Sequence, residues 1–222
     1  MNRVMQEADV LLLATSGPVS PARRALALAG AGGIEAAADL PLGARDAALM
    51  RLRALWFGAD CPCEDTCPAC GQRVEFTAPL PALAEAAAPA PTGCGRLTPR
   101  RLTTADILAI EGLPRAEARL ALARAAAGSD DLSEAEVARI EDWLAAADPL
   151  AHVVFDLTCA HCAAAWSRPF DIVRHLWADL AGAGRRLLAE IHVLASAYHW
   201  TEAEILAVPP ARRRAYLEMI GS

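Results

Sequence analysis

The chain has 222 residues, of which 55% are hydrophobic, and it carries a formal net charge of -6 at pH 7. This length and this hydrophobic fraction suffice for one large domain or two small ones with a buried core, which excludes a disordered chain. The acidic balance argues against nucleic acid as the main partner, because non-specific binding to phosphates depends on positive charge.

Cellular location and cysteine chemistry follow from the start of the chain and the cysteine count. The apolar run at residues 10–14 is too short for a signal-peptide core or for a membrane-spanning helix. We therefore expect a cytoplasmic protein. In a reducing compartment, seven cysteines are more often metal ligands, catalytic thiols or core residues than disulfides.

Residues 1–58 read as an N-terminal helical region. Ser20 and Pro21 open one helix, and leucines at helical spacing predict another over residues 42–57, which Gly58 ends.

The next segment predicts a short strand and then a linker. Val74 and Phe76 alternate with polar neighbours, which indicates a strand. Residues 79–99 are rich in proline and carry glycines around Cys94, so we expect a loop or linker there.

Residues 103–147 read as helical again, with a capping box formed by Ser133 and Glu136, before Asp148 and Pro149 end the helix. Strand patterns over residues 152–157 and 166–170 then predict a β-hairpin bent around two cysteines.

The C-terminal region predicts one long amphipathic helix followed by a short helical hairpin. From Asp171 onward, apolar residues recur at steps of three and four up to Tyr198. A short helix capped by Thr201 with Glu204 follows, and a last helix starts near Pro209 or Pro210.

Two cysteine pairs have the spacing of a structural zinc site, namely Cys67-x-x-Cys70 and Cys159-x-x-Cys162. Two residues between ligands let one tight turn present both sulfurs to one ion, and strand patterns beside both turns are typical of a zinc ribbon. A four-thiolate zinc ion has no open position, so it supports folding rather than hydrolysis.

The 88 residues between Cys70 and Cys159 must then form an inserted helical segment whose ends return to one place. Such an insertion is tolerable because loop-closure entropy grows only logarithmically with length. The predicted fold class is mainly α with a small β zinc ribbon (α+β), in which helical segments surround a split, insertion-containing ribbon. Its segments are 1–58 (N-terminal helices), 59–78 (first half of the ribbon), 79–150 (proline-rich loop and helical insertion), 151–171 (second half of the ribbon) and 172–222 (C-terminal helices).

Other uses of the cysteines rank lower. Cys61 and Cys63 can join Cys67 and Cys70 in a local four-sulfur site, but Cys-x-Cys spacing strains a single tetrahedron. Cys94 reads as a free thiol. A redox dithiol is disfavoured because no βαβ pattern surrounds either pair.

Nothing in the sequence argues for an enzyme. Phosphate-cradling glycine loops, nucleophile elbows and paired metalloprotease histidines are all absent. The remaining candidates read as follows: His161 as a surface residue, His175, His192 and His199 as packing or surface residues, Arg212, Arg213 and Arg214 as partners of a helix dipole, and Trp177, Tyr198 and Trp200 as core or interface anchors.

The C-terminal third resembles the T4-like phage baseplate hub assembly family. The resemblance rests on Phe155-Asp156-Leu157-x-Cys159-x-x-Cys162-x-x-x-Trp166, Phe170-Asp171-Ile172-x-x-x-Leu176-Trp177, Glu190-Ile191-His192-x-Leu194-Ala195-x-x-Tyr198-x-Trp200-x-Glu202-x-Glu204-Ile205-Leu206 and Arg212-Arg213-x-x-Tyr216-Leu217. The earlier run Leu42-Gly43-x-Arg45-Asp46-x-x-Leu49-x-x-Leu52-Arg53 with Phe57-Gly58, and Cys67-Pro68-x-Cys70-Gly71, is similar to longer zinc-containing members from contractile tail and injection-system clusters.

The resemblance implies a non-enzymatic protein that helps the baseplate hub or spike of a contractile tail to assemble, or that remains in the baseplate. The chain departs from the family pattern in adding Cys61 and Cys63, and in having Ala163 where glycine often follows the second cysteine pair.

We expect the C-terminal helices to present a docking face for hub or spike proteins. Its predicted residues are Leu187, Ile191, Leu194, Tyr198, Trp200 and Tyr216. The alternative is a zinc-ribbon nucleic-acid-binding or regulatory protein, in which Arg73, Arg168 and the terminal arginines line a groove.

Overall fold

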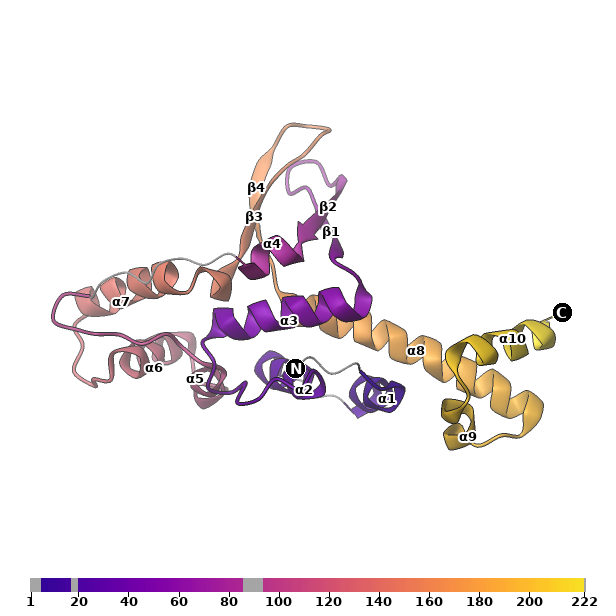
Figure 1. Ribbon diagram of the computed structural model, residues 1–222. Coiled ribbons are helices and arrows are strands. Elements are labelled where there is room, and N and C mark those ends of the chain that lie inside the picture. The colour runs from indigo at the N-terminus through magenta and orange to yellow at the C-terminus, as the bar shows by residue number, and fades with distance from the viewer. Residues whose placement is uncertain (1–4, 17–19, 86–93, 222) are drawn as a thin grey trace.

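The computed structural model describes residues 5–16, 20–85 and 94–221. The chain is mostly helical and has two separate two-stranded antiparallel sheets, so the mainly α, α+β class is confirmed. Figure 1 shows an elongated molecule in which both hairpins project from the middle of one side. Helices α5 to α7 lie at one end, and α9 and α10 lie at the other.

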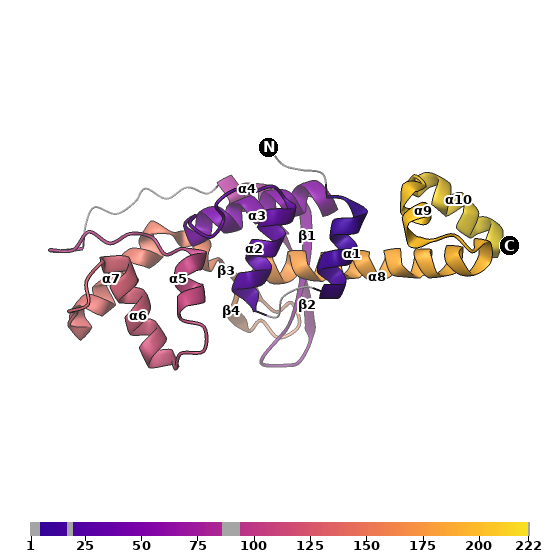
Figure 2. The same ribbon diagram turned by 90° about the horizontal axis from the view of Figure 1, so that it is seen from below.

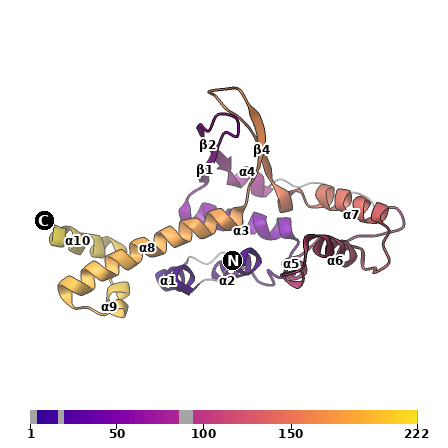
Figure 3. The same ribbon diagram turned by 180° about the vertical axis from the view of Figure 1, so that it is seen from behind.

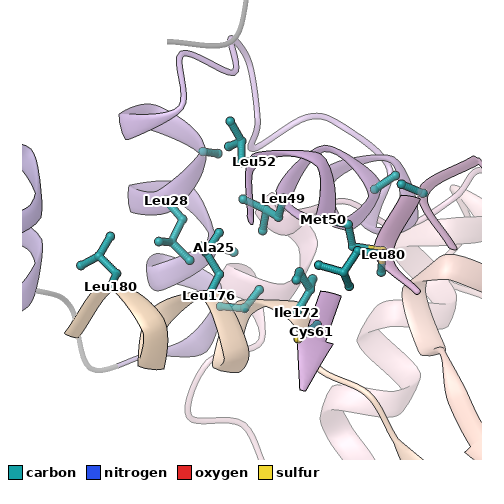
Figure 4. Packing of buried hydrophobic residues seen from close by; sticks show 14 of the residues in the cluster. Ala25, Leu28, Leu49, Met50, Leu52, Cys61, Leu80, Ile172, Leu176 and Leu180 are labelled. Atoms are coloured by element: carbon teal, nitrogen blue, oxygen red, sulfur yellow. The ribbon is translucent and has the colours of Figure 1, made fainter. Parts of the chain in front are cut away.

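The main core lies where three N-terminal helices pack against the long helix α8 (Ile172–Tyr198). These are α1 (Glu7–Ser16), α2 (Pro21–Ala31) and α3 (Leu42–Phe57), and Figure 2 shows α1 and α2 crossing α8. Figure 4 shows the side chains that meet there, and those labelled are Ala25, Leu28, Leu49, Met50, Leu52, Ile172, Leu176 and Leu180 from these helices, with Cys61 and Leu80 from the segment that follows α3.

The predicted helix over residues 42–57 matches α3, and Gly58 ends it with a φ of 95°. Ser20 precedes α2, and Pro21 is its first residue, as the sequence predicts. Proline suits this position because the first helical amide has no partner within the helix.

The first hairpin pairs β1 (Asp60–Thr66) with β2 (Arg73–Pro79). Only β2 was expected, since β1 contains Pro62 and has few of the bulky residues that favour strands. A two-stranded sheet tolerates this proline because each strand has an unpaired edge. The second hairpin pairs β3 (Val154–Thr158) with β4 (Ala165–Pro169), as predicted.

Two predicted segments differ from the observed structure. The segment 79–99 was expected to be a loop, but it begins with helix α4 (Leu80–Glu85), in which Pro81 is tolerated because it lies in the first turn. Residues 86–93 of this segment lie outside the described residues.

The predicted helix over residues 103–147 is broken into α5 (Thr104–Ala109), α6 (Arg115–Ala127) and α7 (Glu134–Ala147). Both breaks contain a glycine with positive φ, Gly112 at 85° and Gly128 at 64°. The Ser133 and Glu136 capping box at the start of α7 is confirmed. A short 3-10 helix, η1 (Pro149–His152), then leads into β3.

Helices α6 and α7 have a core of their own. Its buried members are Cys94, Ala123, Ala126, Val137 and Ile140. The backbone amide of Gly43 on α3 donates to Oδ2 of Asp148 at 3.0 Å, which fastens the end of α7 to the main body. The helical insertion therefore has its own apolar core, and its C-terminal end is attached to α3.

The long C-terminal helix is confirmed, since α8 runs over 27 residues without interruption. Figure 3 shows it extending from the base of the hairpins to the C-terminal helices α9 (Glu202–Ala207) and α10 (Pro210–Gly221). A third cluster joins these helices to α1, and its buried members are Leu11, Leu187, Ile191, Leu194 and Ile205. Within the described ranges, no helix has both the length and the apolar character needed to cross a membrane.

The assignment of Arg212, Arg213 and Arg214 to a helix dipole is wrong. Helix α10 begins at Pro210, so the three arginines lie near its N-terminus, where the dipole disfavours a cation. The side chain of Arg213 is buried instead, with ion pairs to Glu7 of α1 and Glu190 of α8 and a hydrogen bond to the carbonyl of Val208.

Candidate metal centre

Four cysteines from the two hairpin turns come together at one point. Cys67 and Cys70 lie between β1 and β2, and Cys159 and Cys162 lie between β3 and β4. The sulfurs of Cys67 and Cys162 are 3.7 Å apart, as are those of Cys70 and Cys159, and all four lie within 4.8 Å of one another. Sulfurs at 2.3 Å from one tetrahedral ion would be separated by about 3.8 Å, so the cluster has the size to hold a metal ion.

The first turn is closed by two backbone hydrogen bonds. The amide of Cys67 donates to the carbonyl of Gln72 at 2.9 Å, and the amide of Gly71 donates back to the carbonyl of Cys67 at 2.9 Å. Gly71 has a φ of 71°, a left-handed conformation that glycine adopts without steric penalty.

The second turn repeats this geometry. The amide of Cys159 donates to the carbonyl of Ala164, and the amide of Ala163 donates to the carbonyl of Cys159, both at 2.9 Å. Ala163 takes the place of Gly71 and has a φ of 59°. The two turns are thus equivalent in backbone structure although their sequences share only the cysteine spacing.

Backbone amides stabilise a thiolate in each turn. Burial opposes ionisation of Cys67, but the amides of Cys70 and Ala69 donate to its sulfur and lower its pKa to about 7. In the second turn, the amides of Cys162 and His161 lower the pKa of Cys159 in the same way. Each hairpin therefore supplies one sulfur whose charged form, the form that binds metals, is favoured.

The cluster has a buried side and an exposed side. Cys67 and Cys159 are each 1% exposed, whereas Cys70 and Cys162 are exposed. The amide of Gln72 donates to Cys70, but the thiol of Cys162 and its other sulfur neighbours raise the pKa of Cys70 to about 12.

None of the seven cysteines is in a disulfide, and the 3.7 Å separations are far above the 2.05 Å of a sulfur–sulfur bond.

Side chains outside the cluster also hold the hairpins together. The indole Nε1 of Trp166 on β4 donates to Oδ2 of Asp65 on β1 at 2.9 Å, and this hydrogen bond lowers the pKa of Asp65. Beneath them, the rings of Phe76 and Phe155 lie 5.4 Å apart, and Phe155 meets Phe170 edge-on at 5.6 Å. The four cysteines are therefore positioned by protein contacts as well as by their own turns.

Cys61 and Cys63 do not join Cys67 and Cys70, contrary to the lower-ranked alternative. Both lie on β1 beside His175 of α8, and the three possible ligand atoms are within 4.8 Å of one another. Sequence reasoning placed His175 among packing or surface residues. Its 112-residue separation from Cys63 gives no local signal, and only the packing of α8 on the hairpin brings the two together.

The predicted docking face is largely covered by the protein itself. Leu187, Ile191 and Leu194 are buried between α8, α1 and α9. Tyr198, Trp200 and Tyr216 are half-buried and pack on one another, with ring centroids 4.9 to 5.5 Å apart. Leu187, Ile191 and Leu194 therefore belong to the core, and only the exposed parts of the three aromatic rings remain accessible on the predicted face.

The arginines of the nucleic-acid alternative are mostly paired with carboxylates. Arg73 forms ion pairs with Glu64 and Glu75, and Arg168 lies 3.7 Å from Asp65. Both line the hollow beside the first hairpin, but the terminal arginines lie at the far end of α8. The single groove expected for these residues is therefore not formed.

The other singled-out residues have simple environments. His161, His192 and His199 are exposed, as predicted. Cys94 is buried against α6 and α7 rather than lying in an open loop, and Trp177 stacks under the guanidinium of Arg24 at 5.1 Å.

Comparison of the chain with protein-family models, with curated proteins and with solved structures gave no match.

Proposed function

We propose that the protein is a non-enzymatic, zinc-binding assembly protein for the baseplate hub or spike of a contractile phage tail or a related contractile injection system. The observation that carries the metal half of this proposal is the cluster of Cys67, Cys70, Cys159 and Cys162, with paired sulfurs 3.7 Å apart. The baseplate half rests on the residue patterns of the C-terminal third.

Zinc suits this ligand set better than the other common metals. Four sulfurs at tetrahedral spacing are the usual ligands of structural zinc, whereas magnesium and calcium prefer oxygen. An ion with four thiolates has no position for substrate or water, so its role is to stabilise the fold. The ion would join two hairpins that are otherwise separated by the helical insertion.

The elongated architecture supports a scaffold role. Residues of the baseplate-like pattern build the frame of the C-terminal half: Leu176, Ile191, Leu194 and Ile205 are buried. Trp166 fastens the hairpins. We therefore expect chains with this residue pattern to have the same arrangement of C-terminal helices. Long helical surfaces of this kind are suited to contact with other proteins.

Docking is proposed at the C-terminal end of the molecule, beside the Tyr198, Trp200 and Tyr216 rings. Exposed apolar side chains occur on the two helices that carry Tyr198 and Tyr216, with Leu188 of α8 and Met219 of α10 at 39% and 59% exposure. Large apolar side chains are depleted from surfaces that meet only water, and patches of them mark interaction sites.

The zinc proposal is tested by metal analysis of the purified chain. We expect zinc in the Cys67–Cys162 cluster, and replacement of Cys159 by serine should remove this ion. A Cys94→Ala variant, which removes a buried thiol from another core, is the control and should retain the ion. Unchanged metal content in the Cys159→Ser variant would contradict the proposal.

The assembly proposal is tested by affinity capture with purified hub and spike proteins of a contractile tail system from the same genome. We expect association with at least one of them, weakened at least tenfold by Met219→Glu and by Leu188→Glu. Leu113→Glu is the matched control, because Leu113 is 42% exposed at the opposite end of the molecule. Failure of the intact protein to bind any of these partners, or equal loss with the control, counts against the role.

A further inference from the structure

Two cysteines and a histidine form a second group of possible metal ligands at the base of the first hairpin. Cys61 and Cys63 lie on β1, and His175 lies in the first turn of α8. The ligand atoms of all three are within 4.8 Å of one another, and Nε2 of His175 is 3.9 Å from Sγ of Cys63. A sulfur and an imidazole nitrogen bound to one tetrahedral zinc ion would be about 3.6 Å apart, so the group needs only a small contraction.

The local structure explains why these side chains converge. Residues two apart in a strand point to the same face, and both cysteines are on the buried face of β1. Figure 4 shows Cys61 beside Ile172, one turn before His175 on α8. The imidazole of His175 stacks on Phe170 with centroids 5.0 Å apart, which fixes the ring with Nε2 toward Cys63.

The surroundings contain the contacts that usually support metal ligands. The backbone amide of Ala78 on β2 donates to the sulfur of Cys63. The guanidinium of Arg53 donates to Asp179 at 3.0 Å and to the carbonyls of Gly58 and Asp60, which precede Cys61 in the chain. The bond from Ala78 is of the kind that orients a thiolate ligand in metal sites, and the bonds of Arg53 hold the chain that leads into Cys61.

Charge balance also suits a divalent ion. Two thiolates, a neutral imidazole and a divalent ion sum to zero, and Arg53 is already neutralised by Asp179. Occupation of the group therefore leaves no unpaired charge in a buried place, which would be strongly unfavourable.

The group opens onto a hollow, unlike the four-cysteine cluster. The hollow has a volume of about 660 Å³, and Cys63, Phe170, Asp171 and His175 are among the residues that line it. Three protein ligands and one open side are the arrangement of zinc sites that keep a position for water or another small ligand.

We propose that Cys61, Cys63 and His175 bind a second divalent transition-metal ion, zinc or one of similar ligand preference, with a fourth position open to the hollow. This site is independent of the proposed baseplate role. Sulfur and imidazole together select this class of ion over magnesium and calcium.

The first test is a titration of the metal-free full-length protein with Co²⁺ under reducing conditions, followed by visible absorption. We expect saturation at two equivalents in the wild type. Cys63→Ala and His175→Gln should each saturate at one equivalent, and Cys94→Ala should still take two. Saturation of the wild type at one equivalent would overturn the proposal, and so would two equivalents in both site variants.

The second test distinguishes the two ions by their access to solvent. Imidazole or azide is added to the protein that holds two Co²⁺ ions. It should change the absorption bands of the ion at Cys61, Cys63 and His175, which are the bands missing from Cys63→Ala, because this ion has an open position. The absorption that remains in this variant should not change, because four thiolates close the other site. If the site variants do not reach the helical content of the wild type by circular dichroism, the wild-type stoichiometry and its response to imidazole decide alone. No response in the wild type would overturn the open position.

Discussion

The methyl group of Ala14 on α1 occupies the space that a side chain at Gly184 on α8 would need. A Cβ added to Gly184 would overlap the Cβ of Ala14, whereas one added to Gly182 would only touch the guanidinium groups of Arg185 and Arg186. The two glycines weaken the helix equally by propensity, but only Gly184 permits the close approach of α1.

This relationship predicts opposite effects for two similar substitutions. Gly182→Ala should raise the free energy of unfolding by up to about 1 kcal/mol, because alanine is the better helix former. Gly184→Ala should lower it by about 1–2 kcal/mol through overpacking against α1. Denaturant unfolding of both variants checks this, and Ala14→Gly added to Gly184→Ala should restore part of the loss. Equal signs for the two single variants would contradict the close approach.

The matching positions Gly71 and Ala163 give a second prediction. Replacing Ala163 by glycine should stabilise the metal-loaded protein by up to about 1 kcal/mol, because it relieves a left-handed alanine. Gly71→Ala should destabilise by about 1 kcal/mol, and the space around it is open, so the effect is one of backbone conformation. Ala160→Gly in the same turn has no positive φ to relieve and should destabilise slightly. Thermal unfolding of the three variants separates these outcomes.

The hydrogen bond from Trp166 to Asp65 predicts that this contact between the two hairpins contributes to stability in addition to the ion. Trp166→Phe removes the indole donor and should lower the free energy of unfolding by about 1–2 kcal/mol, because a hydrogen bond to a charged acceptor contributes more to stability than one between neutral groups. Asp65→Asn keeps an acceptor oxygen and should lower it less. Urea titration at constant zinc concentration measures both, and a larger effect in Asp65→Asn would argue against the assigned donor.

The buried Arg213 predicts a stability effect at the C-terminal end. Arg213→Met leaves Glu7 and Glu190 without their cation and should destabilise by about 2–3 kcal/mol, less than a fully buried pair because both carboxylates are partly exposed. The exposed neighbour Arg214 provides the control, and Arg214→Met should change stability by less than about 0.5 kcal/mol. Differential scanning calorimetry compares them, and similar transition temperatures would refute the difference.

Metal removal should loosen the hairpins and spare the helical insertion. The four cysteines lie in the turns of two small sheets, whereas α6 and α7 enclose a separate cluster around Ala126 and Ile140. After chelation, we expect faster amide hydrogen exchange in residues 60–79 and 154–169. Exchange in residues 115–147 should change little. Uniform acceleration over both regions would show that the insertion depends on the ion.

Much of the helical architecture follows from local sequence. The steps of three and four from Ile172 to Tyr198 predict α8, and Ser133 and Thr201 mark helix starts that the structure confirms. Strand β1 was missed because Pro62 and the acidic residues around it disfavour a strand when read alone. Its pairing with β2 overrides that preference.

The four-cysteine cluster was predictable because each half is a local turn with fixed spacing, and the equivalent Gly71 and Ala163 close both turns alike. The group of Cys61, Cys63 and His175 was not predictable, because its members meet only through packing of α8 on the hairpin. The burial of Leu187 and Ile191 within the protein could not be predicted either. An amphipathic stripe has the same sequence pattern whether the protein's own helices or a partner cover it.

The sequence distance between the two cysteine pairs has a consequence for synthesis. Cys159 is added to the chain 89 residues after Cys70. At an elongation rate of about 5–20 residues per second, the first pair leaves the ribosome roughly 4–18 s ahead of its counterpart. During that interval the nascent polypeptide contains only half of the four-cysteine cluster, so the cluster can be completed only after the entire insertion has been translated.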